Sequence, residues 1–219
     1  MSDSPEPSGH VVVIDDDESV RSALDSLFRS VGLTPLCYGS VQAFVESGET
    51  EHAACIVLDI RLPGRSGLEY QEALHRNGIA QSVVLISGHV DVQMAVRAMK
   101  AGAVDVLTKP VREQDLLEAV NRALADDRRR RDGARRNTAL LSRHATLTDR
   151  ERQIFALVAE GLQNKQIAAA TGITEATVKL HRGAVMRKME AHSLPDLVRM
   201  ADRLVEVGNA GDRPAGASD

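Results

Sequence analysis

The sequence predicts an α/β domain with a doubly wound, five-stranded parallel sheet, followed by a smaller all-α domain of four helices. The first observation is that short, β-branched apolar runs alternate five times with helical patterns over residues 10–125. Such runs are typical of parallel strands covered by helices on both faces. The second is that the patterns from residue 126 to 207 are all helical. A chain of 219 residues is long enough for two domains with separate cores.

The elements of the α/β part follow one another at regular intervals. The predicted strands are VVVI at 11–14, PLCY at 35–38, CIVL at 55–58, VVLI at 83–86 and VDVL at 104–107. The predicted helices cover about 18–31, 40–47, 67–77, 91–101 and a stretch from 113 onward. Gly32, Gly78 and Gly102 directly follow three of these helices, at positions where a left-handed residue often ends a helix.

Three polar segments flank or join the domains. Residues 1–9 and the tail at 208–219 are expected to be disordered. Residues 126–146 form a basic linker with a helical pattern, in which six arginines fall between residues 128 and 136. A solvated, charged helix explains these arginines better than a contact with DNA phosphates does. Gly133 leaves open whether the linker is one straight helix or bends.

Four helices are predicted over residues 147–207. The first begins with a capping box, in which Thr148 and Glu151 can satisfy each other's backbone donors. The residues expected to cap the next three helices are Asn164, Thr174 and Ser193. Gly208 lies just beyond the expected end of the last helix.

Composition narrows the class of protein. Residues 1–125 carry 18 acidic and 10 basic side chains, whereas residues 126–219 carry 13 acidic and 17 basic ones, which indicates an acidic module joined to one that faces nucleic acid. No apolar run approaches the length of a membrane helix and no signal-peptide pattern is present, so a cytoplasmic protein without membrane contact is expected. Cys37 and Cys55 lie in apolar stretches, where buried thiols are expected rather than a disulfide.

Carboxylates follow two strands of the predicted sheet. Asp15, Asp16 and Asp17 come directly after the first strand, and Asp59 ends the third. Since the carboxyl ends of parallel strands meet at one edge, these groups are expected to gather there, where Mg²⁺ can neutralise them. The residues Ser87 and Lys109 follow the fourth and fifth strands and bring a hydroxyl and a positive charge. The assembly suits phosphoryl transfer to a carboxylate, while Asp17 alone fits a helix cap.

The segments VVVIDDDES, CIVLDIRLPGRSGLE, VVLISGH and VDVLTKP resemble the active-site motifs of response-regulator receiver domains, which have a flavodoxin-like fold. The stretch GHVDVQMAVRAMKAGAVD resembles the FixJ-type branch. The resemblance covers residues 10–125 and implies that Asp59 is the phosphoacceptor. It also implies that Asp16, Asp59 and the backbone carbonyl of Arg61 hold Mg²⁺, with Asp15 acting through water. Lys109, before a cis-Pro110, and Ser87 would contact the phosphoryl group.

One position departs from the receiver pattern. Val106 stands in the fifth strand where such domains usually carry Tyr or Phe. That aromatic ring normally turns inward when the hydroxyl residue moves toward the phosphoryl group. Valine has no ring to turn, so switching must use Ser87, the loop after it and the helix at 91–101.

The segment at 161–189 has the pattern of a helix, a Gly-containing turn and a longer helix. The residues Ile167, Val178 and Val185 can pack between the two helices. The longer helix presents the basic composition expected of a helix that enters the major groove of DNA.

The pattern LTDRE…GLQNKQIA…GIT…TVKLHRGAVMRKM resembles the four-helix DNA-binding domain of NarL, FixJ and LuxR-type regulators over residues 147–207. The resemblance makes 175–190 the recognition helix. Its basic residues, Lys188 included, are expected at the DNA interface. The candidates for the groove-facing surface are Lys179, Leu180, Arg182 and Gly183. The candidates for phosphate contacts are Lys165, Thr177, His181 and Arg187. Gly183 stands where some relatives carry a long basic side chain.

The leading hypothesis is a non-enzymatic transcription regulator that takes a phosphoryl group from a sensor histidine kinase and binds promoter DNA. The resemblance implies a homodimer of the phosphorylated form, built around Met94, Met99 and Val104. A second hypothesis is an aspartyl-phosphate hydrolase, because Asp15 and Asp17 have the spacing of its acid pair. A third is a DNA-binding protein whose receiver no longer switches, for which Val106 is the support.

Overall fold

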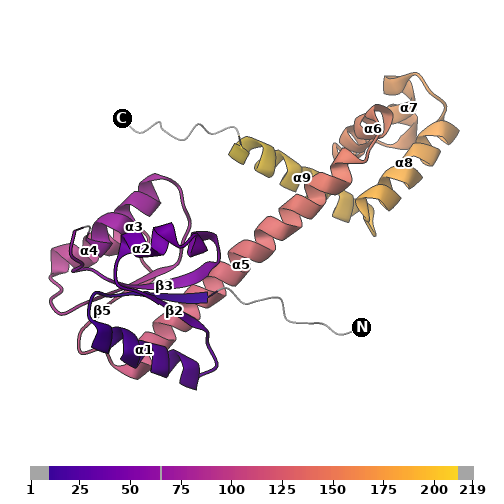
Figure 1. Ribbon diagram of the computed structural model, residues 1–219. Coiled ribbons are helices and arrows are strands. Elements are labelled where there is room, and N and C mark those ends of the chain that lie inside the picture. The colour runs from indigo at the N-terminus through magenta and orange to yellow at the C-terminus, as the bar shows by residue number, and fades with distance from the viewer. Residues whose placement is uncertain (1–9, 65, 212–219) are drawn as a thin grey trace. The chain divides into compact units, whose positions relative to one another are not determined.

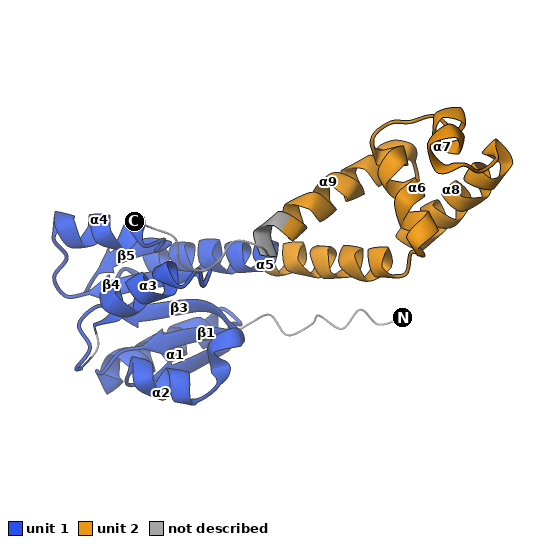
Figure 2. Cartoon of the chain, turned by 90° about the horizontal axis from the view of Figure 1, so that it is seen from above, with its two compact units in different colours: residues 1–130 blue, residues 131–219 orange. Residues whose placement is uncertain are grey.

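The computed structural model describes residues 10–64 and 66–211 and divides the chain into two compact units, Met1–Arg130 and Arg131–Asp219 (Figure 2). The predicted lead-in at 1–9 and residues 212–219 of the predicted tail lie outside the described residues. No helix in the described ranges combines the length and the apolar character that crossing a membrane requires.

The first unit contains the predicted five-stranded parallel sheet. Its strands are β1 (His10–Ile14), β2 (Pro35–Tyr38), β3 (Ala53–Asp59), β4 (Val83–Ser87) and β5 (Asp105–Thr108). The strand order is β2-β1-β3-β4-β5, and every neighbouring pair is parallel. In the central strand, Val57 pairs with Val13 on one side and with Val84 on the other. The order reverses between β1 and β3, so a ligand site is expected at their carboxyl ends.

Helices cover both faces of this sheet (Figure 1). They are α1 (Glu18–Ser30), α2 (Val41–Glu46), α3 (Gly67–Arg76), α4 (Val92–Lys100) and the start of α5 (Glu113–Ala145), with a 3₁₀ turn, η1, at Glu49–Glu51. Ile56 and Leu58 of β3 pack toward α2, α3 and α4, whereas Cys55 and Val57 pack toward α1 and α5. Successive strand residues face opposite sides, which is why a nearly continuous apolar run marks a doubly covered strand.

The structure refines several predicted boundaries. β3 is longer at both ends than the apolar run at 55–58, and β5 begins one residue later than predicted. Gly32, Gly78 and Gly102 all have positive φ angles, as their positions after helices predict. Cys55 is buried, and burial raises the pKa of its thiol, but Cys37 is exposed, so the expectation of a buried Cys37 is wrong. The reason is that β2 is an edge strand, which is only partly covered.

The linker is helical up to Ala145, because α5 runs without interruption from Glu113 to Ala145 and includes Gly133. An interior glycine costs a helix only about 1 kcal/mol relative to alanine, which local ion pairs can offset. Arg129 pairs with Asp126 and Arg130 with Asp127, each one turn apart. The last part of α5 packs on the second unit, where Leu140 is buried in the core.

The second unit contains α6 (Asp149–Ala159), α7 (Asn164–Thr171), α8 (Glu175–Met189) and α9 (Leu194–Gly211), which match the four predicted helices. The capping box of Thr148 and Glu151 is present, and Thr174 caps α8. Two predictions are wrong. The residue at the N-cap of α7 is Gln163 rather than Asn164, whose side chain has another partner. α9 continues past Gly208 to Gly211, since one glycine does not end a helix unless it turns left-handed.

Candidate functional site

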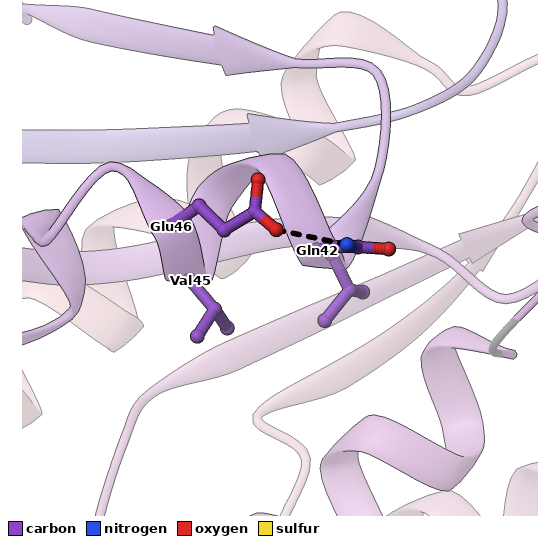
Figure 3. A pocket seen from close by; sticks show the side chains of 4 residues that line it. Gln42, Val45 and Glu46 are labelled. Carbon is purple, nitrogen blue, oxygen red and sulfur yellow. Dashed lines mark hydrogen bonds between the residues drawn. The ribbon is translucent and has the colours of Figure 1, made fainter.

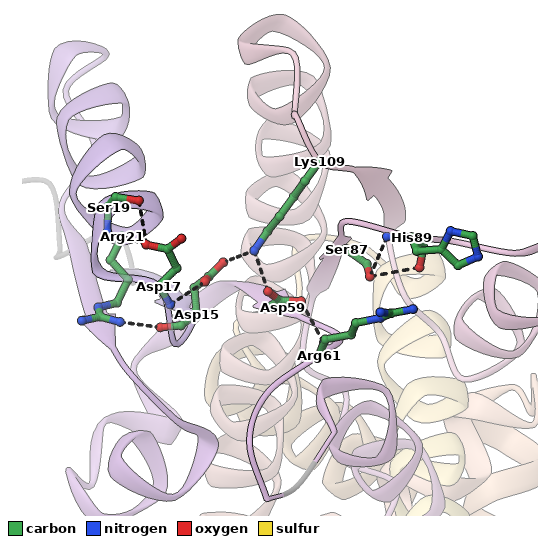
Figure 4. A network of polar contacts seen from close by, with 9 residues as sticks. All are labelled: Asp15, Asp17, Ser19, Arg21, Asp59, Arg61, Ser87, His89 and Lys109. Atoms are coloured by element: carbon green, nitrogen blue, oxygen red, sulfur yellow. Dashed lines mark hydrogen bonds and ion pairs between the residues drawn. The ribbon is translucent and has the colours of Figure 1, made fainter.

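The carboxyl edge of the sheet brings together residues from four strands (Figure 4). Asp15 follows β1, Asp59 ends β3, Ser87 ends β4 and Lys109 follows β5. Asp15 and Ser87 are fully buried, and Asp59 is 5% exposed. The predicted convergence of these side chains is therefore present, because parallel pairing brings the carboxyl ends of all four strands to the same edge of the sheet.

Lys109 bridges the two buried carboxylates. Its Nζ donates to Asp15 Oδ2 at 2.6 Å and to Asp59 Oδ2 at 2.5 Å. Burial by itself would lower the pKa of Lys109, but the hydrogen bonds and negative charges of Asp15 and Asp59 outweigh it and raise this pKa. The ammonium group is therefore firmly charged, and it offsets one of the negative charges at the site.

Three carboxylates are close enough to share a cation. Oxygen atoms of Asp15, Asp16 and Asp59 lie within 4.8 Å of one another, and Asp16 is exposed to solvent. Hard oxygen donors beside open solvent suit Mg²⁺, which keeps several of its waters. The backbone N–H of Arg61 donates to Asp59 Oδ1 at 2.8 Å. This hydrogen bond holds the loop after β3 against Asp59, so the Arg61 carbonyl belongs to the same small region.

Asp17 does not take part in the carboxylate group. Its side chain caps α1 by accepting from Ser19 N at 2.8 Å and Ser19 Oγ at 2.6 Å. These hydrogen bonds lower the pKa of Asp17. The capping role predicted from the sequence is confirmed. Asp17 is also the second acid that the hydrolase hypothesis requires, and its carboxylate is already bound to Ser19 at the start of α1.

Ser87 lies beside the acidic group without contacting it. Its Oγ donates to the carbonyl of His89 at 3.1 Å, within the loop that leads to α4. Val106, on the neighbouring strand, is half-buried and packs against the core cluster that also holds Met94. The peptide bond between Lys109 and Pro110 is cis, as the sequence resemblance implies.

Two residues that support this site lie outside the sequence motifs described above. Arg21 Nη1 donates to the backbone carbonyl of Asp15 at 2.7 Å, which ties α1 to the end of β1. A Cβ atom on Gly67 would lie 2.1 Å from the carbonyl oxygen of Asp59, so the start of α3 approaches β3 more closely than any other residue type permits. The sequence marks Gly67 only as the start of a helix, because the close approach depends on how that helix packs against the preceding strand.

A surface pocket of about 360 Å³ beside α2 is separate from this site (Figure 3). It is lined by Val41, Gln42, Val45 and Glu46, and Gln42 Nε2 donates to Glu46 Oε1 at 2.8 Å across one helical turn. None of the predicted site residues lines it.

In the second unit, α7 and α8 form the predicted helix-turn-helix. Ile167, Val178 and Val185 are buried between the helices, as predicted. Lys165, Lys179, Gly183 and Arg187 are exposed, and Thr177 and His181 are half-buried. Leu180 is 73% exposed although it is a large apolar residue. An exposed leucine beside the exposed Lys179 suits a DNA groove, where it can contact a thymine methyl group.

Two predicted DNA contacts already have protein partners. Lys188 Nζ donates to Glu151 Oε2 at 2.6 Å and to the carbonyl of Thr146 at 3.1 Å. Glu151 is 6% exposed, and its hydrogen bonds from Lys188 and the Thr148 N–H lower its pKa to about 2. Lys188 therefore fixes α8 to the start of α6. Arg182 Nη1 donates to Asn164 Oδ1 at 2.7 Å.

Known proteins share both parts of this arrangement. The family model described as response regulator receiver domain matches residues 11–121, and the one described as bacterial regulatory proteins, luxR family, matches residues 145–201. Nodulation protein W of Bradyrhizobium diazoefficiens is 50% identical over 194 residues, with 89% of this chain and 86% of that protein covered. Response regulator protein TodT of Pseudomonas putida is 43% identical over the same length, with the same coverage of each chain.

Solved structures agree with the sequence relatives. The response regulator StyR superposes with a TM-score of 0.78 at 40% identity, covering 89% of this chain and 98% of that one. Full-length FixJ from B. japonicum superposes with a TM-score of 0.54 at 35% identity, covering 90% and 98% of the respective chains. The chain belongs to the FixJ/NarL-type response regulators, in which a receiver domain is joined to a LuxR-type DNA-binding domain.

Proposed function

We propose that Asp59 accepts a phosphoryl group from the phosphohistidine of a sensor histidine kinase, and that the phosphorylated chain dimerises on promoter DNA. The observation that carries this proposal is the bridge from Lys109 to Asp15 and Asp59 beside the exposed Asp16. Receiver domains are partners of histidine kinases and LuxR-type domains bind DNA. The bounds that we propose are 10–125 for the receiver, 126–146 for the linker and 147–207 for the DNA-binding domain.

The chemistry follows from the positions of these side chains. An oxygen of Asp59 forms the new bond to phosphorus as the bond from phosphorus to the donor imidazole breaks, and the imidazole leaves with that electron pair. Mg²⁺, held by Asp16, Asp59 and the Arg61 carbonyl with Asp15 acting through water, would supply positive charge to the phosphoryl oxygens. Lys109 then donates to a phosphoryl oxygen in place of Asp59. Because its ammonium group has three N–H donors, it can keep its hydrogen bond to Asp15.

Ser87 connects this chemistry to the rest of the receiver. Its hydroxyl group now donates to the carbonyl of His89 and would donate to a phosphoryl oxygen instead. Loss of the bond to His89 would move the loop before α4. α4 exposes Val92, Val96 and Met99, and β5 is the edge strand beside it. We propose that Met94, Met99 and Val104 lie at the centre of the dimer contact that this movement favours. The receiver takes part in its own phosphorylation and in the hydrolysis of its own acyl phosphate, and it has no separate substrate.

The test of the acceptor uses acetyl phosphate with Mg²⁺ and intact mass measurement. The wild-type chain should gain one phosphoryl group, and Asp59→Asn should gain none. Asp17→Asn is the matched control, because Asp17 caps α1 and should leave the yield unchanged. Equal yields in wild type and Asp59→Asn would refute the assignment. Turnover of a generic phosphate ester would instead favour the hydrolase, which the capping role of Asp17 disfavours.

A further inference from the structure

Arg182 is the only candidate for the groove-facing surface of α8 with a side-chain hydrogen bond to α7 within the described part of the chain. Its Nη1 donates to Asn164 Oδ1 at 2.7 Å, and both side chains are half-buried. A guanidinium group has five N–H donors. One hydrogen bond from Nη1 leaves the edge formed by Nε and Nη2 available for a base with two acceptors.

Asn164 lies inside α7 and does not occupy its N-cap, so its side chain can make this contact. The backbone N–H of Gln163 donates to Gln166 Oε1 at 2.8 Å, and Gln163 occupies the N-cap. An asparagine near a helix start usually caps the helix, so its engagement with a residue 18 positions away is informative. A residue of α7, the first helix of the motif, thus orients the side chain of Arg182 on α8, the second helix.

The surroundings of Arg182 place it at the DNA-facing surface. Lys179, three residues earlier, and Gly183, directly after it, are exposed on α8, and Leu180 is exposed beside them. A Cβ on Gly183 would have no neighbouring atom within 4 Å, so the helix carries no bulk there that would hinder an approaching base pair. Gly183 lacks a side chain to read a base, and its neighbour Arg182 has one.

We propose that Asn164 is a positioning residue for sequence recognition, which holds Arg182 in the rotamer that reads a guanine in the major groove. This proposal rests on the DNA-binding role of α8. Arginine reads guanine through O6 and N7 with two N–H donors, and an arginine that is already ordered loses less rotamer freedom on binding. Asn164 should therefore act on base preference although it need not touch DNA.

The test begins with selection of a preferred duplex by the full-length wild-type chain from a random double-stranded library. Affinity is then measured for that duplex and for its single base-pair substitutions, at several salt concentrations. Arg182→Ala should remove the preference at one G·C pair, which we expect to be about 10-fold in the wild type. Asn164→Ala should reduce the preference at the same pair to about 3-fold or less, and the double variant should match Arg182→Ala.

Three further readouts separate positioning from a purely structural role. The slope of log affinity against log salt should be unchanged in Asn164→Ala, because no cation is lost. Asn164→Asp keeps an acceptor at this place and should retain the base preference, with weaker affinity for all duplexes. Thermal unfolding of each variant checks that the DNA-binding unit is folded.

Retention of the full G·C preference in Asn164→Ala, while Arg182→Ala loses it, would overturn the proposal and leave the DNA-binding function intact. Unchanged preferences in Arg182→Ala would overturn it as well. If the wild-type chain selects no duplex, with or without a phosphoryl mimic, the proposed DNA-binding function itself fails.

Discussion

At the scale of single residues, the close approach of Gly67 to Asp59 makes backbone packing part of the proposed phosphoryl-transfer site. The N–H of Gly67 donates to the carbonyl of Ile60 at 3.0 Å, so the loop between β3 and α3 closes on itself directly after Asp59. Any added atom on Gly67 must displace the strand that carries Asp59.

We therefore expect Gly67→Ala to lower the free energy of unfolding of the receiver by about 1–3 kcal/mol through overpacking. Gly133→Ala is the control, because a Cβ there meets no atom within 4 Å, and removal of a helical glycine should raise stability by up to about 1 kcal/mol. Urea unfolding of both variants measures the difference. Equal stabilities would show that the strand moves aside without cost.

The ion pair of Glu151 and Lys188 predicts a pH dependence in the DNA-binding unit. The folded-state pKa of Glu151 is lowered to about 2 from an ordinary value of 4.5, so its contribution to stability is fully present above 4.5. It is lost as the pH falls from 4.5 through about 2. The free energy of unfolding of residues 131–211 can be measured from pH 6 to pH 2, a range of about four pH units. It should fall over the acidic part of this range in the wild type, and Glu151→Gln should make this fall smaller. A parallel decline in the variant would assign the effect to other carboxylates.

At the scale of elements, α5 contributes to two cores: its first part packs in the first unit, and its last part packs in the second. Leu140 is buried in the core of the second unit. The ring centroids of His144 and Phe155 lie 5.5 Å apart, and Arg143 forms an ion pair with Glu190 at the end of α8. The end of the linker is therefore a fifth packing helix of the DNA-binding unit. The DNA-binding domain that we propose at 147–207 therefore shares its core with the last part of the linker.

Leu140→Ala should destabilise the DNA-binding unit by about 2–5 kcal/mol, because it removes a buried side chain. Leu141→Ala is the matched control, since Leu141 is 45% exposed and its loss should change stability by about 0.5 kcal/mol or less. Thermal unfolding of the fragment 131–211 measures both. A small effect at Leu140 would mean that the linker helix is dispensable for this fold.

At the scale of the whole molecule, the proposed phosphoacceptor and the DNA-binding domain lie in different units. Regulation of one by the other would therefore require a conformational state that both units sense. Val106 lacks the aromatic ring used by most receivers, and the route that we propose in its place runs from Ser87 through the next loop to α4. The dimer that we propose along α4 and β5 would pair two DNA-binding units, and such pairing can raise affinity by about 10²–10⁴-fold without any new DNA contact.

Met99→Lys should therefore abolish dimerisation with beryllium fluoride, a phosphoryl mimic, and with it the gain in DNA affinity, while phosphoryl uptake at Asp59 persists. Val45→Lys on α2 is the control, because Val45 is 50% exposed and Met99 is 51% exposed. Sedimentation and DNA titration measure the two effects. A wild-type chain whose oligomeric state and affinity ignore the mimic would support the receiver that no longer switches.

The sequence by itself determined the elements, their order and the residues at the carboxyl edge, because strand and helix periodicities and the ends of parallel strands are local properties of the chain. Only the tertiary structure decided which polar side chains are occupied by distant partners. The side chain of Asn164 accepts from Arg182 instead of capping α7, and Lys188 pairs with Glu151. Such contacts depend on how helices and strands far apart in the chain pack together, and no local pattern encodes that packing.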